Sequence, residues 1–266
     1  MRTSTKRAAP DVPRYPLSSV DNVLRLLMLF RGGRPVRVLE ASAELGVGRS
    51  TAHRLLAALE HRGFVRQEPR TRAYLVGDAL VDLGRSVIRE AELEALAQPE
   101  LESLVARVGE SAHIAVLRGA QVAYVSCVES PELLRTGSHV GTMFPAHATA
   151  SGKAILAELS DADVRKLYAA ETLARVRPKT LGSWSALRAT LEEVRRLGYA
   201  TNFEETEGGV NAIGVAIKDA SGHVHGLITV TGPSSRFRRA NMKQCARDCQ
   251  RVAARIASLM GRQVLL

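Results

Sequence analysis

Apolar residues in the first quarter of the chain recur at intervals of three and four positions, the spacing of helices that bury one face. The pattern predicts three helices, within residues 18–30, 36–45 and 49–61. RGGRP separates the first two, and the turn GVG at 46–48 separates the second from the third. Ser19 or Asp21 is expected to cap the first helix, and Gly63 to end the third. The apolar residues that define these helices are Val23, Leu26, Leu27, Phe30, Val38, Leu39, Ala43, Leu45, Ala52, Leu55, Leu56 and Leu59.

A strand pattern follows the third helix. Residues Phe64–Gln67 and Ala73–Val76 are predicted to form two short strands, joined by the basic turn EPRTR at 68–72. Three helices followed by a two-stranded ribbon are typical of a winged helix-turn-helix, whose recognition helix enters the DNA major groove.

The remaining sequence alternates strand and helix patterns. Residues 78–97 form a long helical stretch, and a further helix is expected from Pro99 to Val108. Hairpins are predicted at 112–129, around Arg118–Gly119, and at 209–233, turning at 219–222. Helices are expected within 147–159, within 183–201 with Gly198 as the stop, and at 240–260. This mixture predicts an antiparallel sheet with helices, an α+β domain.

The charge of the chain is concentrated at its N-terminal end. The formal net charge is +10, yet residues 1–75 hold 14 Lys and Arg against 6 Asp and Glu, while the other 191 residues hold 23 against 21. A small basic module attached to a near-neutral domain explains this asymmetry, and it points to an anionic partner such as DNA. The predicted division is a flexible basic arm at 1–16, a winged helix-turn-helix at 17–77, a linker and dimerisation helix at 78–97, and an effector-binding domain at 98–266.

Three cysteines and the absence of a long apolar run bear on the compartment. Cys127, Cys245 and Cys249 form no paired framework and no metal pattern, so they are expected to be reduced thiols. No apolar run approaches the roughly 20 residues of a membrane span. The basic N-terminus has no apolar core after it, which excludes a secretion signal. A cytoplasmic protein without membrane partner or cofactor is predicted.

The predicted third helix carries its polar residues opposite its buried stripe, near its start. Recognition helices present their N-terminal residues to base edges. Arg49 and Arg54 could bond to guanine or hold phosphates, and Ser50 and Thr51 could cap the helix and bond a phosphate. The alternative is a solvated surface helix with Ser50 as its N-cap. The preceding helix, tight turn and basic wing favour DNA binding. The predicted contacts of this helix are Arg49, Ser50, Thr51, His53 and Arg54.

Other arginines are expected around this helix. Arg66, Arg70 and Arg72 of the wing are predicted to contact phosphates or the minor groove rather than to select sequence. Arg34 and Arg37 are expected near the DNA backbone, at the start of the second helix.

The stretch HATASGKAIL contains Gly152–Lys153 but is not a phosphate loop. Ala154 follows where Ser or Thr is required, and His147 stands in the place of the earlier glycine. Thr149, Ala150 and Ser151 are instead expected to open a helix, whose free backbone N–H groups favour an anion such as a carboxylate.

Threonines and histidines add further candidates. In LITVTGP, Thr229 and Thr231 alternate with apolar residues, so their hydroxyls are expected on one side of a strand. From the residues alone, an ordinary half-buried strand is the favoured explanation, because β-branched threonines fit such a strand well. His223 and His225 could suggest a metal pair, but with no third ligand nearby they are expected to be surface histidines. His113 and His147 are expected near the pocket, and His147 is either a ligand contact or a core histidine.

Seven segments, in this order, resemble the IclR family of bacterial transcriptional regulators over essentially the whole chain. They are SVDNVLRLLMLF, ELGVGRSTAHRLLAALEHRGFV, YLVGDALVDLG, VAYVSCVES, VGTMFPAHATASGKAILAEL, GYATNFEETEGGVNAIGVAI and LITVTGP. The resemblance implies a winged helix that binds double-stranded operator DNA and a C-terminal GAF-like or profilin-like domain that binds an effector. It also implies a homodimer or a homotetramer.

The resemblance also implies where the effector binds. Asn202 and Ala212 depart from a common family pattern, because an acidic residue and a cysteine are frequent at these positions. The effector is therefore expected to differ from those of the best-known members, and a carboxylate with an aromatic or apolar part is favoured. The family's pocket falls on Ala150, Ser151, Asn202, Ala212, Thr229 and Thr231, with Leu133 and Thr136 as possible walls.

Two other classes of protein compete with a metabolite-responsive regulator. A DNA-binding head fused to an enzyme predicts a nucleophile–base pair or a metal cluster, and the sequence has neither pattern, so a non-enzyme is predicted. An architectural DNA binder without a ligand predicts a filled C-terminal core.

Overall fold

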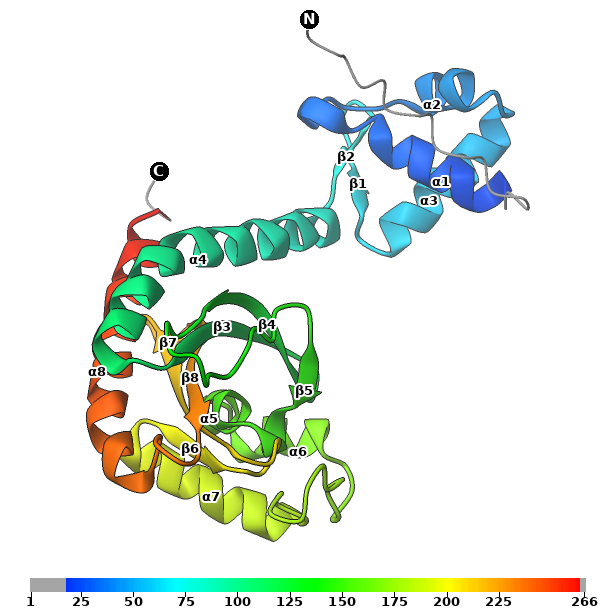
Figure 1. The fold of residues 1–266 in the computed structure, drawn as a ribbon. Coiled ribbons are helices and arrows are strands. Elements are labelled where there is room, and N and C mark those ends of the chain that lie inside the picture. The colour runs from blue at the N-terminus through cyan, green and yellow to red at the C-terminus, as the bar shows by residue number, and fades with distance from the viewer. Residues whose placement is uncertain (1–17, 264–266) are drawn as a thin grey trace, which may run out of the picture. The chain divides into compact units, whose positions relative to one another are not determined.

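The computed structural model describes residues 18–263, so the predicted basic arm at 1–16 lies outside the described residues. The chain forms two compact units, residues 1–88 and 89–266 (Figure 1). None of the helices between residues 18 and 263 is long and apolar enough to cross a bilayer.

The first unit contains the three predicted helices. They are α1 (Ser18–Met28), α2 (Val38–Leu45) and α3 (Arg49–His61), with a 3₁₀ turn, η1, at Arg31–Gly33. Ser19 and Asp21 lie inside the first turns of α1, so the prediction that one of them caps it from outside was wrong. Gly63, which follows the C-cap residue Arg62, adopts φ 73°, a left-handed conformation in which a side chain is strained, and α3 ends before it as predicted. The shared core is formed by Leu26, Phe30, Val36, Ala41, Leu45, Ala52, Leu56, Leu59, Val65 and Tyr74.

The wing consists of β1 (Val65–Gln67) and β2 (Tyr74–Val76), paired antiparallel. Val36 forms an isolated β-bridge with this ribbon, because its N–H donates to the Tyr74 carbonyl at 2.9 Å and its carbonyl accepts from the Tyr74 N–H at 2.8 Å. The wing is thereby fastened to the segment before α2, a link that hydrophobic periodicity does not reveal.

One helix, α4 (Asp78–Val108), occupies the region where two were predicted, and Pro99 lies within it. Proline removes one backbone hydrogen bond, which costs a helix interior about 3 kcal/mol. Here Ala97, Leu101 and Leu104 are fully buried on either side of it, and their packing holds the helix together. The predicted break at Pro99 was therefore wrong.

A six-stranded antiparallel sheet forms the centre of the second unit, in the order β5-β4-β3-β8-β7-β6. Its strands are β3 (Ser111–Arg118), β4 (Gln121–Val128), β5 (Met143–Pro145), β6 (Ala200–Phe203), β7 (Val210–Lys218) and β8 (Val224–Pro233). The hairpins β3–β4 and β7–β8 were both predicted. The two edge strands, β5 and β6, were not, because segments of three and four residues carry too little periodicity to be recognised.

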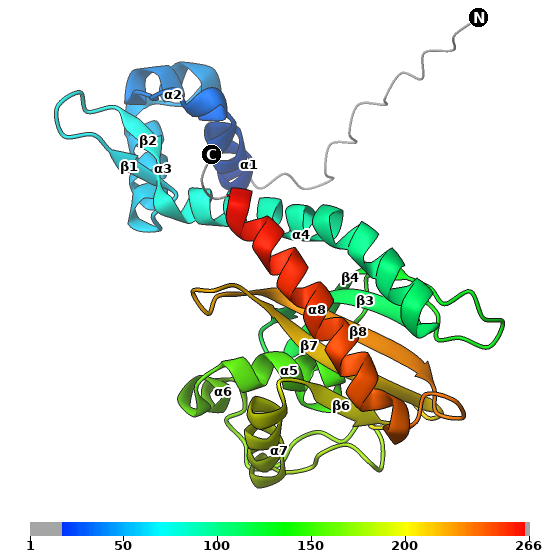
Figure 2. The same cartoon turned by 90° about the vertical axis from the view of Figure 1, so that its left-hand side faces the viewer.

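Helices cover both faces of this sheet (Figures 1 and 2). The C-terminal part of α4 and α8 (Arg239–Gln263) pack on one face. The other face carries α5 (Ala150–Glu158), α6 (Asp161–Leu167) and α7 (Trp184–Leu197), with the short 3₁₀ turn η2 (Ala146–Ala148) before α5. The helix predicted within 147–159 thus begins only at Ala150, and α6 was not predicted.

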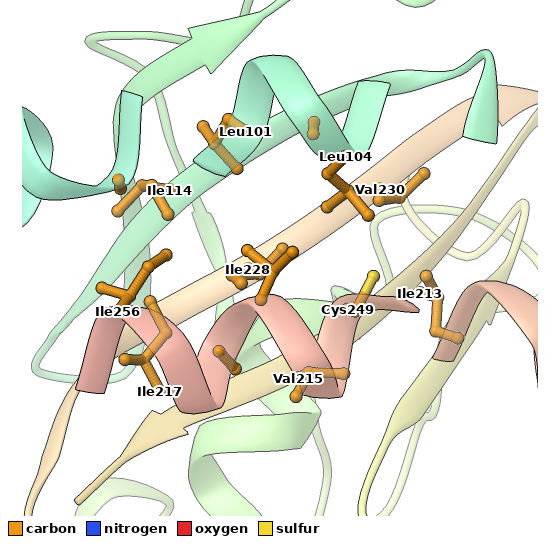
Figure 3. Close-up of a cluster of buried hydrophobic side chains, with 14 of the residues drawn as sticks. Leu101, Leu104, Ile114, Ile213, Val215, Ile217, Ile228, Val230, Cys249 and Ile256 are labelled. Carbon is orange, nitrogen blue, oxygen red and sulfur yellow. The ribbon is translucent and has the colours of Figure 1, made fainter. Parts of the chain in front are cut away.

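Residues of β7 and β8 alternate between the two faces. Ile228 and Val230 point into the core beneath α4 and α8, together with Ile213 of β7 and Cys249 of α8 (Figure 3). Thr229 and Thr231 therefore lie on the opposite face, as the strand period requires. The predicted common side of the two threonines is confirmed, and it is the face toward α5.

Candidate DNA-binding and effector sites

The start of α3 is open to solvent. Arg49, Ser50, Thr51, His53 and Arg54 are all exposed, while Ala52, Leu56 and Leu59 on the other side of the helix are buried. Gly48 is the N-cap and supplies no side chain, so the prediction that Ser50 or Thr51 caps this helix was wrong, both for a DNA-reading helix and for a solvated surface helix. The backbone N–H groups of the first turn have no partner within the helix, which makes this end suited to an anion.

Arginines of the first unit are mostly unpaired. Within residues 18–263, the side chains of Arg37, Arg49, Arg54 and Arg66 form no ion pair or hydrogen bond, whereas Arg34 pairs with Glu40 at 3.0 Å. In the second unit most arginines have carboxylate partners, as in the ion pairs of Arg107, Arg118, Arg135, Arg165, Arg188, Arg195, Arg236, Arg251 and Arg255. Positive charge without an internal partner is thus concentrated around α3, where a phosphate could neutralise it.

The wing presents further basic side chains. Arg66 lies on β1, and Arg70 and Arg72 lie in the turn between β1 and β2; all three are exposed. Arg72 adopts φ 58°, a left-handed conformation that closes the turn. The ten predicted DNA contacts are therefore all accessible, and eight of them belong to α3 or the wing.

The register of the sheet brings distant positions into rows on the face toward α5. Asn202 of β6 pairs with Ala212 of β7, which pairs with Thr231 of β8. In the next row, Thr229 of β8 lies between Gly214 of β7 and His113 of β3. Predicted effector residues from three strands therefore stand side by side.

A cavity opens beside the first row. Its volume is about 30 Å³, room for only one or two water molecules. Four of the predicted effector residues line it, namely Ala150, Asn202, Ala212 and Thr231. The other residues around it are Tyr124, His139, Phe144, Thr149, Thr206, Glu207 and Val210.

Buried polar atoms without a hydrogen-bond partner gather at this cavity. Leaving such an atom unpaired costs about 1–3 kcal/mol, so a cluster of them indicates a site that a ligand or water completes. Among the described residues, Nδ1 of His139 and the Thr231 hydroxyl belong to the lining, and both ring nitrogens of His113 and the Thr229 hydroxyl lie in the next row of the sheet. The other such atoms, on Thr136, His147 and Glu205, belong to residues that do not line the cavity.

The rings at this end of the cavity pack on one another. His113 stacks on His139 at 5.3 Å and meets Tyr124 edge-on at 5.5 Å, between ring centroids. Burial and the neighbouring His139 lower the pKa of His113 to about 4, so its imidazole is neutral at neutral pH. The backbones of Gly137 and Thr229 approach this ring without completing a hydrogen bond. A neutral imidazole offers a ligand one donor and one acceptor.

The side-chain amide of Asn202 forms its hydrogen bonds within the protein. Its amide group donates to the Ala148 carbonyl and to Thr206 Oγ1 at 3.0 Å, and its carbonyl oxygen accepts from the Glu205 N–H at 3.0 Å. A carboxylate here could not donate to the Ala148 carbonyl. Asparagine at this position therefore fixes the segment after β6 against η2, although it also lines the cavity.

Other predicted effector residues lie around the cavity or away from it. The Ser151 hydroxyl bonds the Tyr124 hydroxyl at 3.1 Å, one layer behind the lining. Thr136 is buried, and its carbonyl accepts from Ser111 at 2.7 Å. Leu133 is 99% exposed and does not line the cavity.

The remaining histidines and the cysteines have identifiable surroundings. His147 bonds the Ala174 carbonyl at 2.9 Å and packs edge-on against Tyr168, as a core histidine does. His225 pairs with Asp219 at 2.8 Å in the β7–β8 turn. Between residues 18 and 263 no three potential ligands come together as a metal site. Cys127, Cys245 and Cys249 are free thiols.

Several cavity residues were missed by the sequence analysis. Tyr124 and Phe144 look like ordinary apolar strand residues, and His139 and Glu207 lie in loops without periodicity. Tyr124 could have been found through strand alternation, because the predicted strand places its side chain on one defined face of the sheet, the face toward α5. His139 and Glu207 are 68 residues apart, and no local pattern joins them.

Family models match both units. The model of the IclR helix-turn-helix domain matches residues 19–69, and that of the bacterial transcriptional regulator IclR C-terminal region matches residues 85–258. The chain belongs to the IclR family. The winged helix, the antiparallel sheet domain and a role in transcription regulation are thereby confirmed.

Individual relatives of this IclR-family chain agree with the family assignment. The HTH-type transcriptional regulator XynR of Escherichia coli is 28% identical over 92% of this chain and 98% of its own length. The solved Thermotoga maritima IclR is 25% identical with a TM-score of 0.61, covering 92% of this chain and all of that one. An IclR homologue from Microbacterium hydrocarbonoxydans, solved with 4-hydroxybenzoate, shares the fold at 22% identity and a TM-score of 0.59, with coverages of 90% and 98%. The curated relatives are transcriptional regulators and not enzymes.

Proposed function

We propose that this IclR-family regulator binds operator DNA through α3 and the wing, and that a small organic carboxylate in the second unit controls that binding. The observation that supports an effector is the cluster of unpaired buried polar atoms around the cavity beneath α5. An architectural DNA binder would have no reason to leave these atoms without partners.

The residues that line the cavity indicate which class of effector would fit it. Ala150 opens α5, where unpaired backbone N–H groups favour an anion, and Thr149 caps this helix through the Gly152 N–H at 2.9 Å. Tyr124 and Phe144 supply an aromatic wall at the other end. A carboxylate with a flat apolar part would suit both the start of α5 and the aromatic wall. The effector residues we propose are Ala150, Ala212, Thr229 and Thr231, with Ser151, Asn202 and Thr136 behind them.

The test is a titration of operator binding with small carboxylates. An effector that prefers one arrangement of the protein changes operator affinity by its differential affinity for the two arrangements. We expect at least one carboxylate to change the operator dissociation constant several-fold and to raise the melting temperature by mass action. A complete panel of aliphatic and aromatic carboxylates that alters neither quantity would overturn the proposal.

Arg54→Ala tests the DNA-binding face. If Arg54 contacts a base, its loss is expected to weaken operator binding by about 1–3 kcal/mol while random-sequence DNA is bound almost as before. Fluorescence anisotropy on both DNAs measures this. Equal losses on the two would assign Arg54 to a phosphate instead. Arg118→Ala, which removes an arginine already paired with Glu90 in the second unit, is the matched control.

A homodimer is the proposed assembly. Val20, Leu24 and Met28 of α1 are 51%, 58% and 51% exposed, and their spacing of four residues places them along one stripe of the helix. A two-fold pair of winged helices suits an operator with two half-sites. Sedimentation velocity checks this: Leu24→Glu is expected to dissociate at higher concentration than the unaltered chain, because one of two proposed pairing surfaces is lost, and a monomeric unaltered chain would contradict the proposal.

The predicted division of the chain is retained as a proposal. Residues 17–77 would bind DNA, the helical stretch 78–97 would link and pair subunits, and residues 98–266 would bind the effector. Because α4 is continuous from Asp78 to Val108, a change in the effector-binding unit could bias the dimer through it.

A further inference from the structure

Three glutamates stand close together in the loop between β6 and β7, and each is held by a different segment. Glu204 pairs with Lys179, Glu205 with Lys153 of α5 at 2.6 Å, and Glu207 with His139 at 3.4 Å. The loop is therefore bound at three places, and the three contacts need not serve the same purpose.

Only the third contact belongs to the cavity. Glu207 and His139 both line it, whereas Glu204, Glu205 and their lysines do not. The Glu205–Lys153 pair is buried, with side-chain exposures of 12% and 3%. Thr206 is held as well, because its hydroxyl donates to the Ala148 carbonyl at 2.6 Å. The loop up to Thr206 is thus fixed, and Glu207 is the acidic residue that faces the site.

The charges of the lining are limited to this pair. Among the described residues that surround the cavity, Glu207 is the one carboxylate and His139 the one group able to carry positive charge. The close contact with His139 holds the pKa of Glu207 below its ordinary value, so Glu207 is ionised at neutral pH. His113 and Arg177 are the other charged or titratable groups that act on Glu207.

An anionic ligand therefore meets two obstacles. The cavity of about 30 Å³ does not admit even a small organic acid, and the Glu207 carboxylate would repel its charge. If Glu207, whose side chain is 39% exposed, turns outward into water, the repelling charge leaves the cavity and the space of its side chain is added to it. His139 then loses its partner while its Nδ1 is already unpaired and buried.

We propose that Glu207 is an internal competitor of the effector: its carboxylate occupies His139 in the empty site, and the carboxylate of the effector replaces it. This inference rests on the proposed function and adds how the site is regulated. The replacement conserves one carboxylate contact of His139, so an anion gains what a neutral ligand of the same shape cannot. The site thereby rejects uncharged analogues, which would displace Glu207 without compensating His139.

The experiment compares benzoate with its uncharged analogue benzamide by isothermal titration calorimetry on the full chain. Glu207→Gln keeps the shape of the side chain and removes its charge. Glu204→Gln is the matched control, since Glu204 lies in the same loop and its partner Lys179 is outside the cavity. We expect Glu207→Gln to bind benzoate about tenfold tighter than the unaltered chain, because like-charge repulsion at a binding site costs at least that factor. Benzamide should gain less than benzoate, because it escapes only the cost of breaking the Glu207–His139 contact and no charge repulsion, and Glu204→Gln should behave as the unaltered chain.

Hydrogen exchange provides a readout that needs no ligand. In Glu207→Gln, amides at 207–209 and around His139 are expected to exchange faster than in the unaltered chain, because the contact across the cavity is lost. The proposal is overturned if hydrogen exchange at these amides is the same in Glu207→Gln as in the unaltered chain. It is also overturned if Glu207→Gln binds benzoate equally well or more weakly.

An equal gain for benzamide would also overturn it, because the side chain would then act by size and not by charge. If none of the three proteins binds benzoate, the proposed replacement of the Glu207 carboxylate by a ligand carboxylate is contradicted for aromatic carboxylates. The proposed function fails only if operator binding of the unaltered chain responds to no carboxylate, which the titration above measures separately.

Discussion

Gly214→Ala is expected to separate β7 from α5 and to destabilise the second unit by about 3 kcal/mol or more. A Cβ atom at this position would lie 2.5 Å from the Ala150 carbonyl carbon and oxygen and 2.5 Å from the Ser151 nitrogen. All three are backbone atoms, so no side chain can turn aside. The strand or the helix must shift, and the start of α5 is the end of the helix that lines the effector cavity.

Urea unfolding followed by tryptophan fluorescence measures this loss. Trp184, at the start of α7, is the only tryptophan of the chain, so the signal reports on the second unit. Gly261→Ala is the control: it lies in α8 with open space around the added atom, and we expect a change of less than about 1 kcal/mol, in the stabilising direction. A Gly214→Ala protein as stable as the unaltered chain would show that β7 and α5 are not in backbone contact.

The local elements of the fold could be predicted wherever the sequence marks both ends. Helix α3 begins and ends at the predicted residues, because Gly48 and Gly63 lie at its boundaries and its buried residues recur at helical spacing. The hairpin β7–β8 was found for a similar reason, since its strands are long and turn at a polar segment. At Pro99 the local rule failed, because burial of neighbouring side chains outweighs the cost of one missing hydrogen bond.

The candidate effector site could be predicted only in part. Strand alternation predicted that Thr229 and Thr231 share one side, and a helix start was predicted at Ala150, but the assignment of these residues to an effector site came from the family resemblance. The neighbours that decide the chemistry come from loops: His139 precedes β5, and Glu207 follows β6. Their meeting depends on the strand order β5-β4-β3-β8-β7-β6, which places loops from opposite edges of the sheet over one cavity. Strand order is a property of the whole domain, and no short motif contains it.

The second large effect is expected from Lys153→Met. Lys153 is 2% exposed, and its ammonium group has Glu205 as its partner. Removing one member of a buried ion pair leaves the other charge unpaired and costs about 3–5 kcal/mol. Glu205 Oε2 is already buried without a hydrogen-bond partner, so no neighbouring group stands ready to compensate. Urea unfolding at Trp184 should therefore show a large decrease in the free energy of unfolding. Lys179→Met, which removes the 60% exposed partner of Glu204, is expected to cost less than about 1 kcal/mol.

The double variant Lys153→Met/Glu205→Gln distinguishes the loss of a charge partner from the loss of packing. Burial lowers the pKa of Lys153 despite the attraction of Glu205, which means that the charged form of this lysine is disfavoured in the folded protein. A pair of this kind contributes little net stability, although either half alone is costly. The double variant should therefore recover most of the stability that Lys153→Met loses. If it is as unstable as the single variant, the loss comes from the packing of the lysine side chain; if Lys153→Met is as stable as the unaltered chain, the pair is not buried in solution. Recovery would identify the Lys153–Glu205 contact as an anchor, set by charge matching, for the loop that carries Glu207.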